Sequence, residues 1–474
     1  MAPDGQETDG MKVMKFGGGC IRDARSLGQV ADIVAADRKD CVVVLSAVYG
    51  QTNEIREFAQ KAKEGRADID GFTKGLREEH ETIARQAIED KQALDAALAD
   101  IHGKMLTLEI LLYSVAYTQE LTERTFDLVQ SYGERLSLPL LVGAVQARGA
   151  RAKGFESDKI GMLTDGVFGG ATADLPVTRE NLQKYVVPEL KKGIVPAITG
   201  FFGCSSDGMT TTFGRNGSDY SAAVIASALD ADLLEVWKDV DGFMSADPKI
   251  VGSARAVPKL SYDEAGEIAY FGTKILHPRT IEPIRPKNIP IAVRNTHAPG
   301  KVATMITAEG SGRWSEIKSV GHSTELALLK LYGAGFAYKP GVVLEISKEL
   351  FKHNMGIYSV VSSQLYLSIL LHSRDADKGA EILGNVRTSG IEKVELDKDV
   401  GLINVVGDGI GGIKGLPGAI FTTVANAGVG IKQISLSGTL NALNFLVAKG
   451  DIERTVNALH SRYVLKELGA EKLV

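Results

Sequence analysis

Short apolar segments alternate with longer helical segments over residues 11–310. Segments 42–45, 193–198 and 233–237 are bounded and largely apolar, which is typical of strands buried on both faces of a parallel sheet. The stretch 59–101, rich in Lys, Glu, Ala and Leu, is expected to be helical. This alternation predicts a layered α/β domain with a mostly parallel sheet over 11–310.

The rest of the chain contains an internal repeat. Three turn positions recur in the same order, Gly333, Pro340 and Gly356 in one copy and Gly407, Pro417 and Gly430 in the other. Each copy is expected to run strand, glycine turn, helix, strand, strand, the order of a ferredoxin-like module. We expect one module over 319–395 and the second over 400–474. The sequence leaves open whether terminal strands are exchanged between the two modules.

Composition excludes several classes of protein. Of the 474 residues, 44% are hydrophobic and 24% are charged, which is the balance of a globular chain with two or three domains. The net charge of −5, with no basic block, argues against nucleic acid as a partner. No apolar run reaches the roughly 20 residues that span a bilayer, so we expect no membrane partner.

The three cysteines, Cys20, Cys41 and Cys204, form neither a close pair nor a cluster with metal-ligand spacing. This spacing predicts no cysteine-based metal site and favours a reducing compartment, the cytoplasm. Residues 1–10 are polar and are expected to form a disordered tail.

Two glycine-rich stretches indicate sites for anions. Residues 14–20, Met-Lys-Phe-Gly-Gly-Gly-Cys, suit a strand that runs into a turn whose amides approach phosphate, with Lys15 as a point charge. Residues 210–221 carry hydroxyls, glycines, Arg215 and Asp219 directly before an apolar segment, so a helix N-terminus there would attract carboxylate or phosphate. An ordinary helix cap would explain the second stretch alone equally well.

The chain lacks the sequence motifs of other phosphate-binding enzymes and of hydrolases. The chain contains neither a G-x-x-x-x-G-K-[ST] P-loop nor G-x-S-x-G. Residues 407–412 satisfy G-x-G-x-x-G, but no acidic residue occurs between Asp408 and Asp451, where a dinucleotide site needs one.

If the acceptor is a carboxylate, its pKa near 3.9 leaves it ionised at neutral pH and no general base is required. The site then needs only to hold two anions in line and to neutralise charge.

Three further segments complete an ordered set of motifs: 131–137 (Ser-Tyr-Gly-Glu-Arg-Leu-Ser), 237–242 (Trp-Lys-Asp-Val-Asp-Gly) and 271–278 (Phe-Gly-Thr-Lys-Ile-Leu-His-Pro). With the two glycine-rich stretches, this set resembles the aspartate kinases of the amino-acid kinase family, from Met11 to the C-terminus. The resemblance implies the amino-acid kinase fold for the first domain and paired regulatory ACT domains for the repeat. It also implies phosphorylation of the side-chain carboxylate of L-aspartate by ATP and Mg²⁺, which opens the lysine, threonine and methionine pathways.

The resemblance assigns residues on the nucleotide side of the site. Lys15 and Asp219 are implied as catalytic, with Lys15 on the transferring phosphoryl group and Asp219 orienting the lysines and the metal-bound phosphates. Amides of the glycine turn would contact phosphate, and Lys238 and Asp239 lie where the family contacts base and ribose. The implied nucleotide-binding residues are Lys15, Gly17, Gly18, Gly19, Lys238, Asp239, Lys249 and Lys274.

On the acceptor side, the resemblance implies that Arg215 takes the α-carboxylate of aspartate and Glu134 its ammonium group. The full implied set is Thr52, Glu134, Phe201, Arg215 and Ser218. Taken one at a time, Glu134 could be a surface helix residue, Phe201 a core residue and Thr52 a helix cap. His277 is expected to be structural, because no acid–base step needs it.

The chain departs from the family pattern on the nucleotide side. Gly19 and Cys20 stand where the family has Thr and Ser, Lys238 replaces a Thr, and Lys249 replaces an Arg. Losing a hydrogen bond to a charged group, about 1.5–3 kcal/mol, would slow catalysis without abolishing it. In the ACT repeats, the effector-contacting Asn aligns with Tyr366 in one copy and Ala442 in the other, so we expect weak feedback inhibition.

Three functions are compatible with these motifs. The first is an aspartate kinase, acting on L-aspartate and ATP and forming a homodimer or larger homo-oligomer through its ACT domains. The second is a catalytically weakened regulatory paralogue, suggested by Gly19, Cys20 and Lys238. The third is a kinase of another acidic amino acid. Retention of Lys15, Asp219 and Lys274 favours the first over the second. The 131–137 motif with the tandem repeat favours it over the third.

Overall fold

The computed structural model describes residues 10–37, 40–271, 275–310, 317–333, 341–386, 390–436 and 440–464. Contacts divide the chain into two compact units. The N-terminal unit comprises Met1–Phe243, Pro258–Tyr262 and Ile275–Gly310, and the C-terminal unit comprises Met244–Val257, Asp263–Lys274 and Ser311–Val474. Two segments that we expected within 11–310 are therefore grouped with the repeat.

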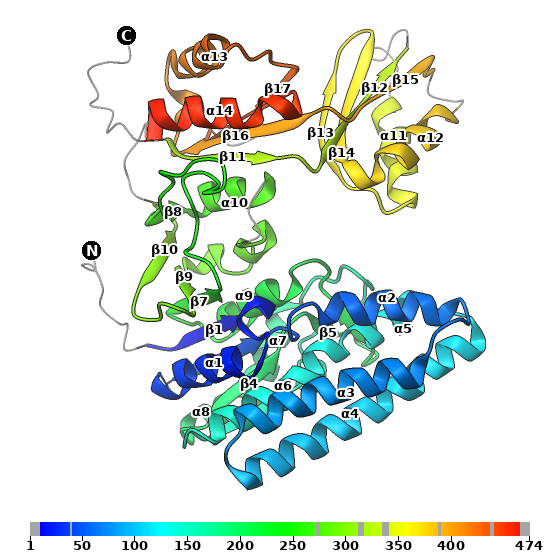
Figure 1. Ribbon diagram of the computed structural model, residues 1–474, viewed down its shortest axis with the longest axis vertical. Helices are drawn as coiled ribbons and strands as arrows, with labels where there is room; N and C mark the ends of the chain where they lie inside the picture. The colour runs from blue at the N-terminus through cyan, green and yellow to red at the C-terminus, as the bar shows by residue number, and fades with distance from the viewer. Residues whose placement is uncertain are drawn as a thin grey trace. The chain divides into compact units, whose positions relative to one another are not determined.

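The N-terminal unit is built on an eight-stranded sheet in the order β3-β4-β2-β1-β7-β9-β10-β8. Figure 1 labels β1, β4, β7, β8, β9 and β10 of this sheet. Its neighbouring strands pair in parallel, except β9 with β10, so the predicted α/β fold with a mostly parallel sheet is confirmed. The strands are β1 Lys12–Phe16, β2 Cys41–Leu45, β3 Ala152–Phe155, β4 Val195–Thr199, β7 Leu233–Lys238, β8 Lys259–Ser261, β9 Ile291–Asn295 and β10 Val302–Thr307, with the hairpin β5 Phe202–Cys204 and β6 Thr210–Thr212 beside them.

Helices cover this sheet. They are α1 Ala24–Ala36, α2 Gln51–Lys63, α3 Ile69–Ala87, α4 Lys91–Thr118, α5 Glu123–Gln130, α6 Tyr132–Gln146, α7 Leu175–Tyr185, α8 Val187–Lys191 and α9 Gly217–Ala228. The stretch expected to be helical over 59–101 is divided among α2, α3 and α4. Asp68 and Asp90 begin new helices there, because their side chains accept hydrogen bonds from the amides of Gly71 and Ala93. No helix in the described part of the chain has the length and apolarity to cross a membrane.

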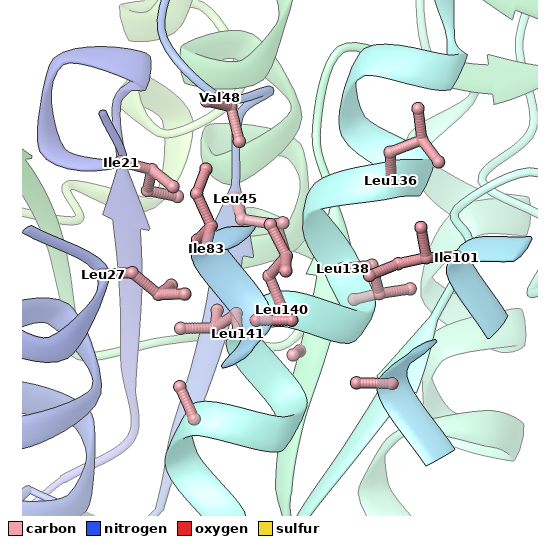
Figure 2. Packing of buried hydrophobic residues seen from close by; sticks show 14 of the residues in the cluster. Ile21, Leu27, Leu45, Val48, Ile83, Ile101, Leu136, Leu138, Leu140 and Leu141 are labelled. Carbon is pink, nitrogen blue, oxygen red and sulfur yellow. The ribbon is translucent and has the colours of Figure 1, made fainter. Parts of the chain in front are cut away.

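Two buried helices position the site. Leu136, Leu138, Leu140 and Leu141 of α6 pack among buried residues of the β-strands and neighbouring helices (Figure 2). Every residue of α9 is buried. Because both helices are fixed by packing, polar side chains in their first turns have little freedom to move.

In the C-terminal unit, one contiguous segment forms a complete ferredoxin-like module. Its elements are β12 Leu326–Tyr332, α11 Val342–Lys352, β13 Ile357–Ser362, β14 Tyr366–His372, α12 Ala376–Gly384 and β15 Lys393–Asp397. The sheet order is β13-β14-β12-β15, with antiparallel pairs throughout. The predicted βαββαβ order is present here within a single stretch of chain.

The sheet of the second module includes β11, a strand that precedes the first module in the chain. Its sheet order is β11-β16-β18-β17, built from β11 Ile317–Ser323, β16 Gly401–Gly407, β17 Gln433–Leu436 and β18 Ala442–Val447, with helices α13 Leu416–Asn426 and α14 Ile452–Leu459. β11 pairs antiparallel with β16, with Val320 opposite Val405. The module expected over 319–395 therefore begins inside a strand that belongs to the other sheet, because β11 buries Ile317 and Val320 in the core of the second module.

The remaining segments of the C-terminal unit attach to β11. α10 Tyr262–Phe271 supplies Glu264, which forms a buried ion pair of 2.7 Å with Lys318. The amide of Val320 donates to the carbonyl of Ser245 at 2.9 Å, and the hydroxyl of Ser319 donates to the carbonyl of Met244 at 3.0 Å. These bonds explain why 244–257 and 263–274 group with the repeat.

Candidate active site

The glycine turn begins where β1 ends. Residues 18–20 form one short 3₁₀ turn, and the amide of Gly17 donates to the carbonyl of Trp237 at 3.3 Å. A methyl group placed on Gly17 would lie 3.5 Å from the Nζ atom of Lys15, and one on Gly18 would lie 3.2 Å from the carbonyl oxygen of Ala47. Glycine therefore keeps the surface beside the lysine free of side-chain atoms, as close approach of an anion requires.

Three elements bring charged side chains together beside this turn. Lys15 of β1 lies 2.5 Å from Oδ1 of Asp219 in the first turn of α9, and Lys238 at the end of β7 lies 3.2 Å from Oδ2. Both Lys15 and Asp219 are almost fully buried. β1 and β7 are neighbours in the sheet (Figure 1), so adjacent strand ends deliver both lysines to one carboxylate.

The protonation states of this triad follow from burial and pairing. Burial lowers the pKa of Lys15, while Asp219 opposes that shift. Burial alone would raise the pKa of Asp219, but the two lysines outweigh it and hold the pKa below its usual value. The triad thus carries two cations around one anion, and this excess positive charge suits an anionic ligand.

Glu134 lies in the first turn of α6 and is almost fully buried. Its Oε1 accepts from the amide of Ala47 at 3.2 Å and from the hydroxyl of Ser218 at 3.5 Å. Its Oε2 is buried and has no hydrogen-bond partner among the described residues. Burial raises the pKa of Glu134 to about 8, against opposition from these hydrogen bonds and from Lys15. An unsatisfied buried oxygen of this kind is suited to a donor on a ligand.

Phe201, between β4 and β5, has a φ of 73°, in the left-handed region that bulky residues avoid. Its carbonyl accepts from the amide of Phe213 at 2.9 Å. A methyl group on the preceding Gly200 would approach Cβ of Ser218 to 2.8 Å. The turn at Phe201 is therefore in close contact with the N-terminus of α9. Backbone in such sparsely populated conformations is concentrated at functional sites.

Thr52 and Arg215 complete the predicted acceptor set. Thr52 is half-buried at the start of α2, and a methyl group on Gly133 would lie 3.2 Å from its Oγ1, so the hydroxyl faces the residue before Glu134. Arg215 is exposed in the turn before α9. Burial lowers the pKa of His277, Asp219 opposes that shift, and the positive charges of Arg279 and Arg215 add to it.

Comparison with known proteins identifies the fold family. Residues 10–295 match the amino acid kinase family, and residues 403–463 match an ACT domain. The chain belongs to the amino acid kinase family. It is similar to lysine-sensitive aspartokinase 3 of Escherichia coli, at 28% identity over 95% of this chain and 98% of that protein, and to chloroplastic aspartokinase 3 of Arabidopsis thaliana, at 30% identity over 95% and 81%.

Longer relatives and a solved structure extend this comparison. The bifunctional aspartokinase/homoserine dehydrogenase of Haemophilus influenzae is 27% identical over 95% of this chain, which spans 56% of that protein; related bifunctional proteins of Zea mays are covered over about half their length. The crystal structure of E. coli aspartokinase III in complex with aspartate and ADP superposes with a TM-score of 0.80 at 26% identity, covering 96% of this chain and 100% of that one.

Two predicted nucleotide residues, Lys249 and Lys274, lie outside the described part of the N-terminal unit. Lys249 belongs to the C-terminal unit, where its amide donates to Oδ1 of Asp247 at 2.9 Å. Lys274 lies outside the described residues. The remaining implied nucleotide residues, Lys15, Gly17, Gly18, Gly19, Lys238 and Asp239, lie on β1, β7 and the turns that follow them.

The two departures in the glycine turn, Gly19 and Cys20, have structural partners. The thiol of Cys20 is buried and donates to the carbonyl of Trp237 at 3.3 Å, and burial raises its pKa, so it stays protonated. Cys20 therefore points inward as a neutral donor. A methyl group on Gly19 would lie 2.8–2.9 Å from the carboxylate atoms of Asp239. Asp239 occupies the space that a threonine at this position would need.

Sequence reasoning missed several residues that support the site. Arg279 donates to the carbonyls of Ala171 at 2.6 Å and Phe213 at 3.2 Å, and stacks over the ring of Tyr220. Asp127 is buried in α5 and accepts from the amide of Thr212 at 2.7 Å. Neither carries a sequence signal, because a lone Asp in an amphipathic helix and a lone Arg after His-Pro look like solvent-facing residues.

Proposed function

We propose that this chain transfers the γ-phosphoryl group of ATP to the side-chain carboxylate of L-aspartate and so forms 4-phospho-L-aspartate. The observation that carries the proposal is the buried, unsatisfied Oε2 of Glu134, close to the first turn of α9 that holds Ser218 and Asp219. An amino acid's ammonium group is the donor that satisfies it. The similarity to aspartokinases over nearly the whole chain supports aspartate as that amino acid.

The residues divide the work by charge. Glu134 would bind the ammonium group and Arg215 the α-carboxylate, which leaves the side-chain carboxylate of aspartate to face Lys15. That carboxylate is already ionised, so attack on phosphorus needs no proton removal. Lys15 and Lys238 would then neutralise charge that spreads over the phosphoryl oxygens during transfer, with Asp219 fixing both ammonium groups.

The glycine turn fits a nucleotide. The open surface at Gly17 lies beside Lys15, so phosphate oxygens can reach both the backbone and the ammonium group. Within the described residues, no group of three or more His, Cys, Asp or Glu side chains is arranged to hold a metal ion. Mg²⁺ would therefore arrive with the nucleotide phosphates, near Asp219, and would supply further neutralisation of phosphate charge.

Trapping the acyl phosphate tests the proposal. Purified protein with Mg-ATP and hydroxylamine should give a hydroxamate with L-aspartate and much less with L-glutamate or D-aspartate. A preference for another acidic amino acid would assign a different acceptor. ATP binding by calorimetry without any hydroxamate would identify the chain as a regulatory paralogue.

Assembly and location are further parts of this proposal. α11 of the first module exposes 69% of Leu344 and 77% of Phe351, apolar surface that a second copy would cover. We therefore expect a homo-oligomer through the ACT modules, and sedimentation that shows only a monomer at micromolar concentration would contradict it. The three cysteines are free and buried, and the cytoplasm remains the proposed compartment.

A further inference from the structure

Arg22 lies just beyond the glycine turn, and three contacts fix its guanidinium. Its Nη2 donates to Oδ2 of Asp239 at 2.6 Å, and its Nε donates to the carbonyl of Gly19 at 3.1 Å. Its Cζ lies 4.2 Å from the centre of the Tyr49 ring. Arginine can make all three contacts at once because its fork is planar and stacks on aromatic faces.

The same carboxylate lies over Gly19. Its oxygens and carbon are 2.8–2.9 Å from where a Cβ atom of residue 19 would be, closer than real Cβ contacts allow. The φ of Gly19 is not in the left-handed region, so the backbone itself accepts any residue. The three nearest atoms all belong to Asp239, so a side chain at position 19 would have to displace the carboxylate that Arg22 holds.

We propose that Arg22 is a positioning residue for nucleotide binding, which holds the Asp239 carboxylate in the space left open by Gly19 and directs it toward the ribose. The inference rests on the proposed function, in which Asp239 contacts the nucleotide. Gly19, Arg22 and Asp239 act as one set: position 19 lacks a side chain, and the Asp239 carboxylate, held by Arg22, lies where that side chain would begin. Gly19 is then an adaptation of the site and no sign of lost activity.

Single substitutions test the role of Arg22. Arg22→Ala should raise the KM for ATP and the Kd for ADP about fivefold, which corresponds to about 1 kcal/mol, while kcat and the KM for aspartate change little. Arg22→Lys should recover only part of this loss, because lysine cannot bond Gly19 and Asp239 together. The preference for ATP over 2′-deoxy-ATP should fall in Arg22→Ala. Arg25→Ala, an exposed arginine in the first turn of α1, is the matched control and should behave as wild type.

A double substitution tests the coupling to Gly19. Gly19→Thr alone should weaken ADP binding by about tenfold, because the new side chain displaces a carboxylate that Arg22 holds. In the Arg22→Ala background Asp239 can move away, so Gly19→Thr should cost about threefold less than it does alone. Additive effects, or tighter ADP binding by Arg22→Ala, would overturn the proposal.

The readouts separate this inference from the proposed function. ADP binding is measured by calorimetry without any acceptor, and hydroxamate formation is measured separately. If wild-type protein forms hydroxamate but Arg22→Ala binds ADP normally, only the role of Arg22 fails. If wild-type protein binds ADP without forming hydroxamate, the kinase proposal fails, while the effect of Arg22→Ala on ADP binding still decides the role of Arg22.

Discussion

The proposed acceptor side and the proposed nucleotide side of the site differ in how their carboxylates are paired. Glu134 is almost fully buried and leaves one oxygen without a partner. Asp239 is about a third exposed and is paired with Arg22, whose own side chain is about half exposed. The acceptor side thus has a buried carboxylate oxygen that a ligand could bind, and the carboxylate of the nucleotide side is already paired with Arg22.

This difference indicates where the site tolerates change. A buried, unsatisfied carboxylate binds strongly to one kind of donor and accepts few substitutions, because each leaves a desolvated group behind. Exposed ion pairs contribute little individually and can be exchanged for others. The departures at Gly19, Cys20 and Lys238 all lie on the proposed nucleotide side.

The largest expected effect comes from the triad that joins the two sides. Lys15→Met should lower kcat about 10²–10³-fold with little change in the KM for aspartate, because Lys15 acts on charge that develops during transfer. Steady-state kinetics with both substrates measures this. Lys12→Met, a buried lysine of the same strand that pairs with Asp37 at 2.8 Å, is the control and should retain kcat. A rise in KM at constant kcat would instead make Lys15 a ground-state ligand.

On the acceptor side, Glu134→Gln should raise the KM for aspartate tenfold or more, since a hydrogen bond to a charged group contributes about 1.5–3 kcal/mol. In wild-type protein that KM should fall as pH rises from 6.5 to 8.5, because the pKa of Glu134 is about 8 and only the ionised form binds the ammonium group well. The KM of Glu134→Gln should lack this pH dependence. A parallel pH profile in both proteins would exclude Glu134 as the ammonium ligand.

Substitutions of the exposed Arg215 test the other end of the proposed acceptor side. Arg215→Ala should raise the KM for aspartate about tenfold with kcat largely retained, because a carboxylate clamp serves bound substrate and transition state alike. Arg215→Lys should be intermediate, since it keeps the charge and loses the fork. A loss confined to kcat would move Arg215 from the aspartate to the phosphoryl group.

Stability gives a smaller effect with a defined sign. The folded-state pKa of Glu134 is raised from 4.5 to about 8, so protonated Glu134 favours the folded state at low pH, and this contribution is lost as pH rises toward 8. Melting temperature of the ligand-free protein should therefore fall more steeply between pH 5 and 8 in wild type than in Glu134→Gln. Identical slopes would show that Glu134 is solvated in the free protein.

The smallest effect should come from the ACT modules. Lysine or threonine, alone or together, should change the rate by less than about twofold, because Tyr366 and Ala442 stand where the family's effector contact would be. Ala442 is also buried in its strand. Titration into the hydroxamate assay measures this. Strong inhibition well below millimolar would contradict the alignment of the effector pocket.

The sequence predicted a mostly parallel sheet and singled out three charged residues that lie together in the structure. Apolar runs placed β2, β4 and β7 to within two residues, because a strand buried on both faces needs a largely apolar run. Motifs on separate elements located Lys15, Asp219 and Lys238, since parallel strand ends and a helix N-terminus meet at one sheet edge.

The features that the sequence did not give are two helix breaks and several long-range contacts. The breaks at Asp68 and Asp90 are local caps inside a uniformly helical composition. The role of Arg22 depends on Asp239, more than two hundred residues away, and neither side chain is unusual in its own segment. The unpaired state of Glu134 depends on how α6 packs, which no pattern within 131–137 records.

The pairing of β11 in the sheet of the second module affects how the chain folds. The first module can fold from segments that are neighbours along the chain. By contrast, β11 pairs with β16, which is synthesised only after β12 to β15. Such distant pairing adds loop-closure entropy and slows assembly. During synthesis, 317–323 therefore emerges as an unpaired edge that exposes Ile317 and Val320 until 401–407 leaves the ribosome. A fragment meant to isolate the first module should accordingly start at Leu326, because one that starts at Ile317 would carry a strand with no sheet to join.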